Sequence, residues 1–257
     1  MEQGGAARIR QALGEKYPDL RIRTLDTADS TNLRLKEAAR AGAIRPPWLL
    51  TADEQTAGRG RLGRTFVSPP GTGLYMSLLL DHSPAASGQV TITAAVAVCR
   101  AIEDLTPLRP KIKWVNDLFV RGKKVCGILA EAVENRVIVG IGVNLLTPAG
   151  GFPPEAGPAG ALDVPVDRFS LAGRIALHLL DGMAQDFSAV LDDYRARMPL
   201  VGCAIRYLVN GNEKTARVKG IDGEGGLIID GPDGPDTLRC GEISLGSQSF
   251  SDFSVFE

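Results

Sequence analysis

Three apolar segments that follow one another closely limit the possible fold more than any other feature. They are Lys111–Val115, Val125–Val133 and Arg136–Leu145, all with residues that favour strands. The turn signals Asn116-Asp117, Arg121-Gly122 and Glu134-Asn135 separate them. Connections this short favour antiparallel hairpins, because parallel strands need a much longer crossover. The sequence therefore predicts a sheet that is at least partly antiparallel.

Helices and further strands are expected around these hairpins. The spacing of apolar residues and the position of capping residues and glycines separate the two kinds of element. Pro148–Gly160, with four prolines and four glycines, can only be a loop. We expect strands at Arg21–Leu25, Trp48–Ala52 and Leu74–Leu80, and helices at Ala6–Tyr17, from a cap at Ser30 or Thr31 to Gly42, at Gln89–Leu105 and at Phe169–Tyr194.

From about Pro199 the pattern changes to short strands divided by glycines. Such a pattern is typical of a small β-barrel. We therefore expect an α+β protein in which residues 1–198 form one domain with a sheet and helices, and residues 199–257 form a small barrel. The expected barrel strands are Ala204–Val209, Lys214–Ile221, Gly226–Asp230 and Thr237–Glu242.

Charge and cysteine content exclude several classes of function. Lys+Arg (29) nearly equals Asp+Glu (30), so no global field attracts nucleic acid or an anionic membrane. The four cysteines form no C-x-x-C pair, so we expect no zinc site and buried free thiols at Cys99 and Cys126. We find no signal peptide and no apolar run of membrane-spanning length, and we expect a cytoplasmic protein.

The segment Gly58–Arg64 places three arginines and three glycines in a loop. Glycine lets a ligand approach the backbone, and arginine offers planar donors suited to phosphate and carboxylate. Three like charges this close repel one another, so we expect a loop that is mobile when empty and ordered by a polyanion. The alternative is a solvated or RNA-binding turn, which its position between two predicted strands disfavours.

The strand that contains Val139–Asn144 has one face without side chains. Alternation places Val139, Ile141 and Val143 toward the core, and Gly140, Gly142 and Asn144 on the other face. Two glycines on one face suggest that something flat approaches there, such as a nucleobase beside the amide. Close packing of a helix is the alternative.

Polar residues lie at the ends of the predicted hairpin. Asn116 and Asp117 follow one strand, where such residues commonly form a turn, and Lys124 precedes the next. A lysine at the mouth of a buried strand can direct a compact charge into a pocket. Glu131 lies deep in that strand, so it either faces solvent or meets an arginine.

Together these motifs resemble the biotin–protein ligase family over nearly the whole chain. The matches, in order, are Ser30-Thr31-Asn32, Gln55 with GRGRxGR, KWxND, K-x-x-G-I-L-x-E and G-x-G-x-N. The resemblance implies a mixed β-sheet with helices, akin to class II aminoacyl-tRNA synthetase cores, followed by an SH3-like barrel. Val115 stands where many members have proline.

The resemblance also implies a reaction in two steps. Biotin and MgATP give biotinyl-5′-AMP, and a lysine of a biotin carboxyl carrier protein domain then takes the biotinyl group. Arg61 and Lys124 are the implied catalytic cations, and Asp117 could accept the amine proton. The implied biotin site comprises Ser30, Thr31, Asn32, Gln55, Gly58, Arg59, Gly60, Arg61, Tyr75, Lys124 and Gly127. The implied ATP site comprises Arg59, Arg61, Arg64, Asn116, Lys124, Gly140, Gly142 and Asn144, and no residue is assigned as a metal ligand.

Two other functions remain as alternatives. A lipoate ligase of related fold would use a similar lysine, and a non-catalytic RNA-binding module would use the Arg/Gly loop. Some family members repress transcription through an N-terminal winged helix-turn-helix. Only 29 residues precede Ser30 and the chain is not basic, so we expect no DNA binding. We expect no membrane association, and a homodimer is left open.

Overall fold

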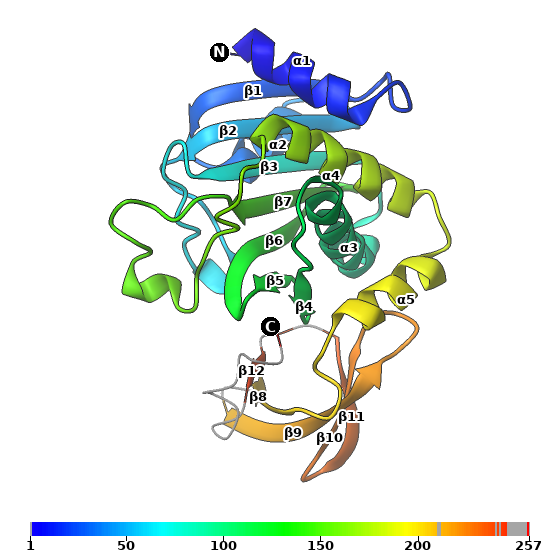
Figure 1. Cartoon of the computed structure of the whole chain (residues 1–257). Helices are drawn as coiled ribbons and strands as arrows, with labels where there is room; N and C mark the ends of the chain where they lie inside the picture. Colours follow the sequence, from blue (N-terminus) through cyan, green and yellow to red (C-terminus); the bar gives the residue numbers. More distant parts are fainter. Residues whose placement is uncertain (1, 210–211, 240, 242, 246–255, 257) are drawn as a thin grey trace.

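The chain forms a seven-stranded sheet with helices and a separate five-stranded sheet (Figure 1). The structure is a computed structural model, and it describes residues 2–209, 212–239, 241, 243–245 and 256. The α+β class expected from the sequence is confirmed.

The first sheet is mixed, as predicted. Its strand order is β1-β2-β3-β7-β6-β5-β4, in which β1 pairs with β2 in parallel and every other neighbouring pair is antiparallel. The two hairpins between β5 and β7 follow from the short turns in the sequence. The strands are β1 (Arg21–Ala28), β2 (Trp48–Gln55), β3 (Gly73–Leu80), β4 (Lys111–Lys113), β5 (Asp117–Val120), β6 (Lys123–Val133) and β7 (Arg136–Asn144).

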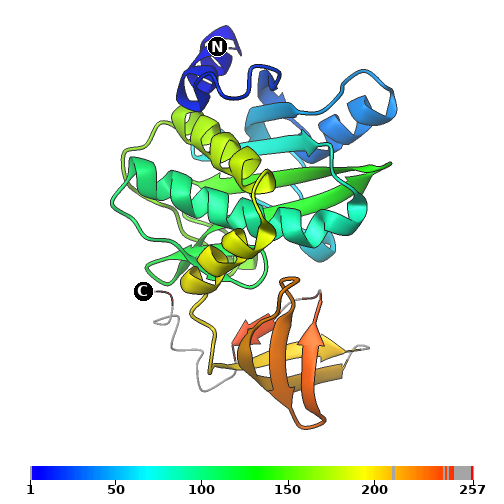
Figure 2. The same ribbon diagram turned by 90° about the vertical axis from the view of Figure 1, so that its right-hand side faces the viewer.

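Helices cover both faces of this sheet. The helices α3 (Ser87–Leu105) and α4 (Arg168–Met183) pack on one face, with α1 (Glu2–Leu13) beside α4 and β1 (Figures 1 and 2). The short helix α2 (Thr31–Arg40) packs on the opposite face, against β2, β3, β6 and β7. Because α2 is short, it leaves part of that face uncovered for a site.

The predicted alternation along β7 is confirmed. Val139, Ile141 and Val143 are fully or nearly fully buried in the main core, which α3 and α4 complete. Gly140 and Gly142 lie on the other face, the one that α2 partly covers. One face of the sheet therefore builds the core, and the other is available for binding.

The core helix α3 corrects one expectation. By length and composition alone, Pro84–Leu105 is apolar enough to cross a membrane, so the expectation that no run reaches that length is wrong. In the fold, 61% of its most apolar window is buried inside the protein. The burial of residues such as Val90, Ala94 and Val98 accounts for its composition. Cys99 on this helix and Cys126 are buried free thiols as expected, whereas Cys240 lies outside the described residues.

Several element boundaries differ from those predicted. The single helix expected at Phe169–Tyr194 is two helices, α4 and α5 (Phe187–Arg197), because Asp186 caps a new helix by accepting from the backbone N–H of Ser188. Strand β4 stops at Lys113, so the turn at Asn116 starts a strand, β5, that the sequence did not indicate. The expected helix at Ala6–Tyr17 lies earlier, at Glu2–Leu13.

The second sheet is entirely antiparallel, with the order β11-β10-β9-β8-β12. Its strands are β8 (Ala204–Val209), β9 (Asn212–Ile221), β10 (Leu227–Gly231), β11 (Gly234–Leu238) and β12 (Ile243–Leu245), of which β12 was not expected. The turn between β9 and β10 rests on the first domain, where the indole N–H of Trp114 donates to the Gly225 carbonyl at 3.0 Å. We propose that the domain boundary lies at 198/199, between α5 and β8.

Candidate active site

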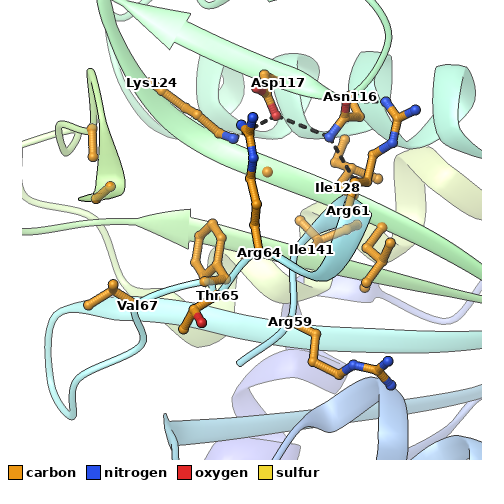
Figure 3. A pocket seen from close by; sticks show the side chains of 18 of the residues that line it. Arg59, Arg61, Arg64, Thr65, Val67, Asn116, Asp117, Lys124, Ile128 and Ile141 are labelled. Atoms are coloured by element: carbon orange, nitrogen blue, oxygen red, sulfur yellow. Dashed lines mark hydrogen bonds and ion pairs between the residues drawn. The ribbon is translucent and has the colours of Figure 1, made fainter. Parts of the chain in front are cut away.

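A cavity of about 770 Å³ opens on the face of the first sheet that carries the β7 glycines. It gathers most residues predicted from the sequence, although they come from α2, β2, the Arg/Gly loop, β5, β6 and β7 (Figure 3). The predicted residues that line it are Ser30, Thr31, Asn32, Gln55, Arg59, Gly60, Arg61, Arg64, Asn116, Asp117, Lys124, Gly127, Gly140, Gly142 and Asn144.

One end of the cavity is polar and uncharged. Ser30, Thr31 and Asn32 at the start of α2 are each at least 97% buried. Gln55, at the end of β2, accepts the backbone N–H of Thr31 at 2.9 Å and donates to Ser68 at 3.0 Å. Ser30 occupies the N-cap position, yet its side chain makes no capping hydrogen bond, so the expected capping role is wrong. The hydroxyl of Ser30 is therefore not used by the helix it precedes.

The Arg/Gly loop is a closed turn that covers the other end. The backbone N–H of Gly60 donates to the Arg64 carbonyl at 2.7 Å, and that of Phe66 to the Gly58 carbonyl at 3.0 Å. Gly58 has no room for a side chain, because a Cβ there would lie 2.3 Å from the Phe66 carbonyl oxygen. At the tip, Leu62 adopts a left-handed conformation (φ 52°). The glycines thus serve the tight path of the loop.

The three arginines of the loop point in different directions (Figure 3). Arg61 donates to the Asn116 side chain at 2.8 Å and to the Gly241 carbonyl of the second domain at 2.9 Å. Arg64 extends toward Lys124 and Asp117, whereas Arg59 lies 3.8 Å from Glu131. This divergence lowers the mutual repulsion of the cations. The mobility of the empty loop stays a prediction.

Lys124 and Asp117 form an ion pair at the cationic end. Their side-chain atoms are 2.8 Å apart, and the Asn116 amide donates to Asp117 at 3.1 Å. The backbone of Lys124 is fixed by the loop after β7, since its N–H donates to the Pro158 carbonyl and its carbonyl accepts from Gly160. Lys124 therefore enters the cavity from a restrained position, as the sequence predicted.

The glycine face is not bare in this structure. A Cβ at Gly142 would lie 2.4 Å from the Phe66 ring, and one at Gly140 would lie 2.3 Å from Asn32 Oδ1. The flat groups against this strand are therefore a phenyl ring and an amide of the protein itself. The expected bare shelf is wrong, although both glycines are explained by the close approach that the sequence indicated.

Three residues of the predicted site, Asn144, Tyr75 and Gly58, contact other parts of the protein. The Asn144 amide donates to the Gly160 carbonyl at 2.9 Å, which fixes the loop after β7. Tyr75 is 1% exposed, its hydroxyl donates to the Pro69 carbonyl, and its ring meets Phe66 edge-on. Among the described residues, the cavity wall is built without Tyr75 or Gly58, which lie directly behind it.

The sequence left open whether Glu131 faces solvent or meets an arginine. In the structure its carboxylate contacts cationic side chains and an amide. Its carboxylate lies 3.2 Å from Lys36 Nζ, and its second oxygen accepts from Asn32 at 2.9 Å. Burial raises the pKa of Glu131, but the hydrogen bonds from Asn32 and Lys36, with the charges of Lys36 and Arg59, lower it more, so the net shift is downward. Glu131 is therefore ionised at neutral pH.

Sequence reasoning missed several residues of the site. Phe66 lies on two glycines of the cavity wall, and Ser77 hydrogen-bonds beneath it. The available signal for Ser77 was a single small polar side chain in the strand-like run Leu74–Leu80. Gly241, Ile243 and Ser244 of the second domain also line the cavity, and no sequence pattern indicates this contact.

No group of three or more His, Cys, Asp or Glu side chains suited to a metal ion occurs within the described part of the chain. The carboxylates that line the cavity are those of Asp117 and Glu155. These two separate carboxylates leave few protein oxygens for a metal ion at the cavity.

Known protein families match both parts of the chain, the one that forms the first sheet and the one that forms the second. Residues 25–146 match the biotin/lipoate A/B protein ligase family, and residues 202–246 match the biotin protein ligase C terminal domain. A biotin--[acetyl-CoA-carboxylase] ligase from Paracoccus denitrificans is 33% identical, with 86% of this chain and 99% of that protein covered. The structure of the biotin protein ligase from Aquifex aeolicus in complex with biotin and ATP has a TM-score of 0.74 and 30% identity, and covers 88% of this chain and 98% of that one.

A longer relative matches as well. The bifunctional ligase/repressor BirA of Bacillus subtilis is 34% identical over 77% of this chain, which spans 66% of that relative. The cavity and the first family match define the class, that of the biotin/lipoate A/B ligases. Within that class, the chain belongs to the biotin protein ligase family.

Proposed function

We propose that this protein joins biotin to ATP and then transfers the biotinyl group to a lysine of a carrier domain. In the first step the biotin carboxylate attacks the α-phosphorus, biotinyl-5′-AMP forms and pyrophosphate leaves. In the second step the lysine amine attacks the acyl carbon, AMP leaves and the amine loses a proton. The observation that carries the proposal is one cavity lined both by the uncharged polar side chains of Ser30, Thr31 and Gln55 and by the cations Arg61, Arg64 and Lys124, which Figure 3 shows near Asp117 and Asn116.

The cationic end suits the first step. Carboxylate and triphosphate repel each other, and fixed cations in a partly enclosed cavity offset that repulsion and stabilise charge in the transition state. Arg61 and Lys124 are held by Asn116 and Asp117, so their positive charges are placed before substrate arrives. Bound magnesium would neutralise further phosphate charge. Asp117 is the proposed acceptor of the amine proton in the second step.

The polar end favours biotin over lipoate. Ser30, Thr31 and Gln55 are polar and line the cavity, and a ureido ring offers both donors and an acceptor to such groups. The dithiolane ring of lipoate has no N–H or carbonyl, so it would leave these buried groups without partners, at a cost of about 1–3 kcal/mol each. We propose that Gly142 and Asn144 border the nucleotide subsite, and that Gly140, which Asn32 covers, lies where the nucleotide and biotin subsites meet.

The proposal is tested by incubating the purified protein with magnesium and ATP plus either biotin or lipoate. We expect pyrophosphate release and an acyl-adenylate with biotin, and a much slower reaction with lipoate. Faster reaction with lipoate would reassign the substrate, and no reaction with either acid would refute the proposal. The cytoplasmic location, the absence of DNA and membrane binding and a homodimer stay predictions, to be checked by fractionation, DNA and vesicle binding and light scattering.

A further inference from the structure

A chain of buried polar groups runs beneath the polar end of the cavity. Asn32 lies across Gly140, and on the neighbouring strands Ser77 of β3 and Leu129 of β6 stand opposite that glycine. Asn32 is 3% exposed and Ser77 is fully buried. The side chain of Asn32 therefore bridges three strands over a position where a side chain would not fit.

The orientation of the Asn32 amide is fixed by its neighbours. Its nitrogen lies 2.9 Å from Glu131 Oε2 and 3.3 Å from the Leu129 carbonyl, and both of these oxygens only accept. The NH₂ group must therefore face β6, and the amide oxygen faces Ser77 at 2.6 Å. Both ends of Asn32 are engaged by the protein, so its role is to position other groups.

The direction of the next two hydrogen bonds follows from this orientation. The amide oxygen only accepts, so the one hydroxyl proton of Ser77 is donated to Asn32. Ser77 Oγ and Thr31 Oγ1 are 2.7 Å apart, and because the single Ser77 proton is used by Asn32, we assign the proton of this contact to Thr31. Gln55 Oε1 accepts the backbone N–H of Thr31 at 2.9 Å and lies 3.1 Å from Thr31 Oγ1, so it competes for the Thr31 proton at a longer distance than Ser77 Oγ does.

With its proton turned inward, Thr31 offers only lone pairs to the cavity. Gln55 Oε1 lies beside it and is also an acceptor, and both residues line the cavity. We propose that Glu131, acting through Asn32 and Ser77, holds Thr31 as a hydrogen-bond acceptor and thereby makes this end of the cavity select ligands with N–H donors. The proposal rests on the proposed function, in which that ligand is the cyclic urea of biotin, and it makes Glu131 and Ser77 positioning residues.

Glu131→Gln provides a direct test, because it should reverse the donor–acceptor direction of the hydrogen bonds that run from residue 131 through Asn32 and Ser77 to Thr31. The Oε1 of Glu131 faces Lys36 and Arg59, so the oxygen of a glutamine there would stay with these cations and its NH₂ would face Asn32. Asn32 would then turn over, exchanging its long 3.3 Å bond to the Leu129 carbonyl for a bond from the glutamine, donate to Ser77 and leave the Ser77 proton for Thr31. The proton of Thr31 would be free to point into the cavity, and the acceptor would become a donor.

The experiment measures the dissociation constants of biotin and of an analogue in which oxygen replaces one ureido N–H, by calorimetry on the full chain. In the wild type we expect the analogue that faces Thr31 to bind on the order of 10–100-fold more weakly, because two acceptors then face each other. Replacing one or the other of the two ureido N–H groups gives two carbamate isomers. Both are measured, because only one of them places its ring oxygen opposite Thr31. In Glu131→Gln and Ser77→Ala we expect this ratio to fall at least several-fold.

A matched control removes a buried hydroxyl elsewhere. Thr93→Val, in α3, deletes a hydroxyl that donates to the Gln89 carbonyl, and it should leave the ratio unchanged. A loss of packing alone would weaken biotin and the analogue equally, so ratios equal to that of the wild type in either folded variant would overturn the proposal. Failure of the wild type to bind biotin at all would instead refute the proposed function. Should Ser77→Ala not fold, Glu131→Gln, whose side chain is partly exposed, decides the question.

Discussion

At the scale of single residues, the site depends on what each side chain already contacts before a substrate arrives. Lys124 is paired with Asp117, and Arg61 is bound by Asn116, so in the proposed reaction each cation would exchange a protein acceptor for a substrate anion. Because the groups are prealigned, little reorganisation is needed when charge develops in the transition state. The cost of removing either cation should therefore appear in the rate of adenylation.

Lys124→Ala and Arg61→Ala are each expected to slow adenylation by on the order of 10²–10³, the scale of one electrostatic stabiliser. Pyrophosphate release at saturating biotin and ATP measures this rate. Lys123→Ala is the matched control, because Lys123 is the exposed neighbour of Lys124 on β6. A turnover near that of the control for either variant would remove that residue from the proposed mechanism.

Gly140→Ala tests the close approach of Asn32. A methyl group 2.3 Å from Asn32 Oδ1 would push the amide away from Ser77 or Glu131, and overpacking of this kind costs about 1–3 kcal/mol. Denaturant unfolding should show this loss of stability, together with weaker biotin binding. Gly220→Ala, also a strand glycine but with open space around its Cβ position, should change neither quantity. Equal stability of the two variants would mean that Asn32 can relax without loss.

At the scale of elements, charged side chains join the helices that cover the core. Asp104 of α3 accepts from Arg174 and from the imidazole of His178, both on α4. Burial raises the pKa of Asp104, but its hydrogen bonds to His178 and Arg174 lower it more, so the net shift is downward. A carboxyl whose pKa is lower in the folded state stabilises the fold above its unfolded pKa, and this contribution disappears as pH falls through the folded pKa.

Asp104→Asn should therefore lower the melting temperature at pH 7 and have progressively less effect below about pH 3.8, the ordinary pKa of the group. Thermal unfolding of both proteins between pH 2.5 and 7 gives the comparison. Asp19→Asn is a suitable control because that aspartate is exposed and belongs to no helix. A difference between wild type and Asp104→Asn that stayed constant down to pH 2.5 would contradict the expected direction of the pH dependence.

Strand β7 and the boundary between α4 and α5 show which parts of the elements could be predicted from the sequence. Alternation predicted the core face of β7 and the glycine face correctly, because strand geometry is a local property. The groups that fill the glycine face, Phe66 and Asn32, come from distant segments, and no local pattern specifies which side chain covers which glycine. The break between α4 and α5 was missed because apolar spacing continues across it, while the cap at Asp186 decides the boundary.

At the scale of the whole molecule, the described residues of the second domain contact the first at several places, among them the stacked rings of Phe256 and Phe119 of β5, whose centroids are 4.6 Å apart. Trp114 donates to the Gly225 carbonyl, and the guanidinium of Arg195 in α5 donates to the carbonyls of Ile221 and Asp222. A further contact is at the cavity, which Gly241, Ile243 and Ser244 of the second domain help to line. The small sheet is therefore part of the active-site wall.

Trp114→Phe keeps the ring in the core but leaves the Gly225 carbonyl without its indole donor. We expect a loss of about 1–3 kcal/mol in the free energy of unfolding, the cost of an unsatisfied buried acceptor. The second domain should also become more sensitive to protease near residues 198–203. Trp48→Phe, on the far side of the first sheet, serves as the control. Identical digestion patterns for the two variants would show that the indole contact does not hold the domains together.

The side chain of Arg61 links the two domains at the cavity. Its guanidinium is rigid and planar, and one such group hydrogen-bonds both Asn116 of the first sheet and the Gly241 backbone of the second. It cannot swing toward an incoming anion while keeping its angle to both partners. An anion that draws Arg61 away must therefore break its bond to Asn116 or its bond to the Gly241 backbone, and we expect a spectroscopic label on the second domain to respond when ATP is added.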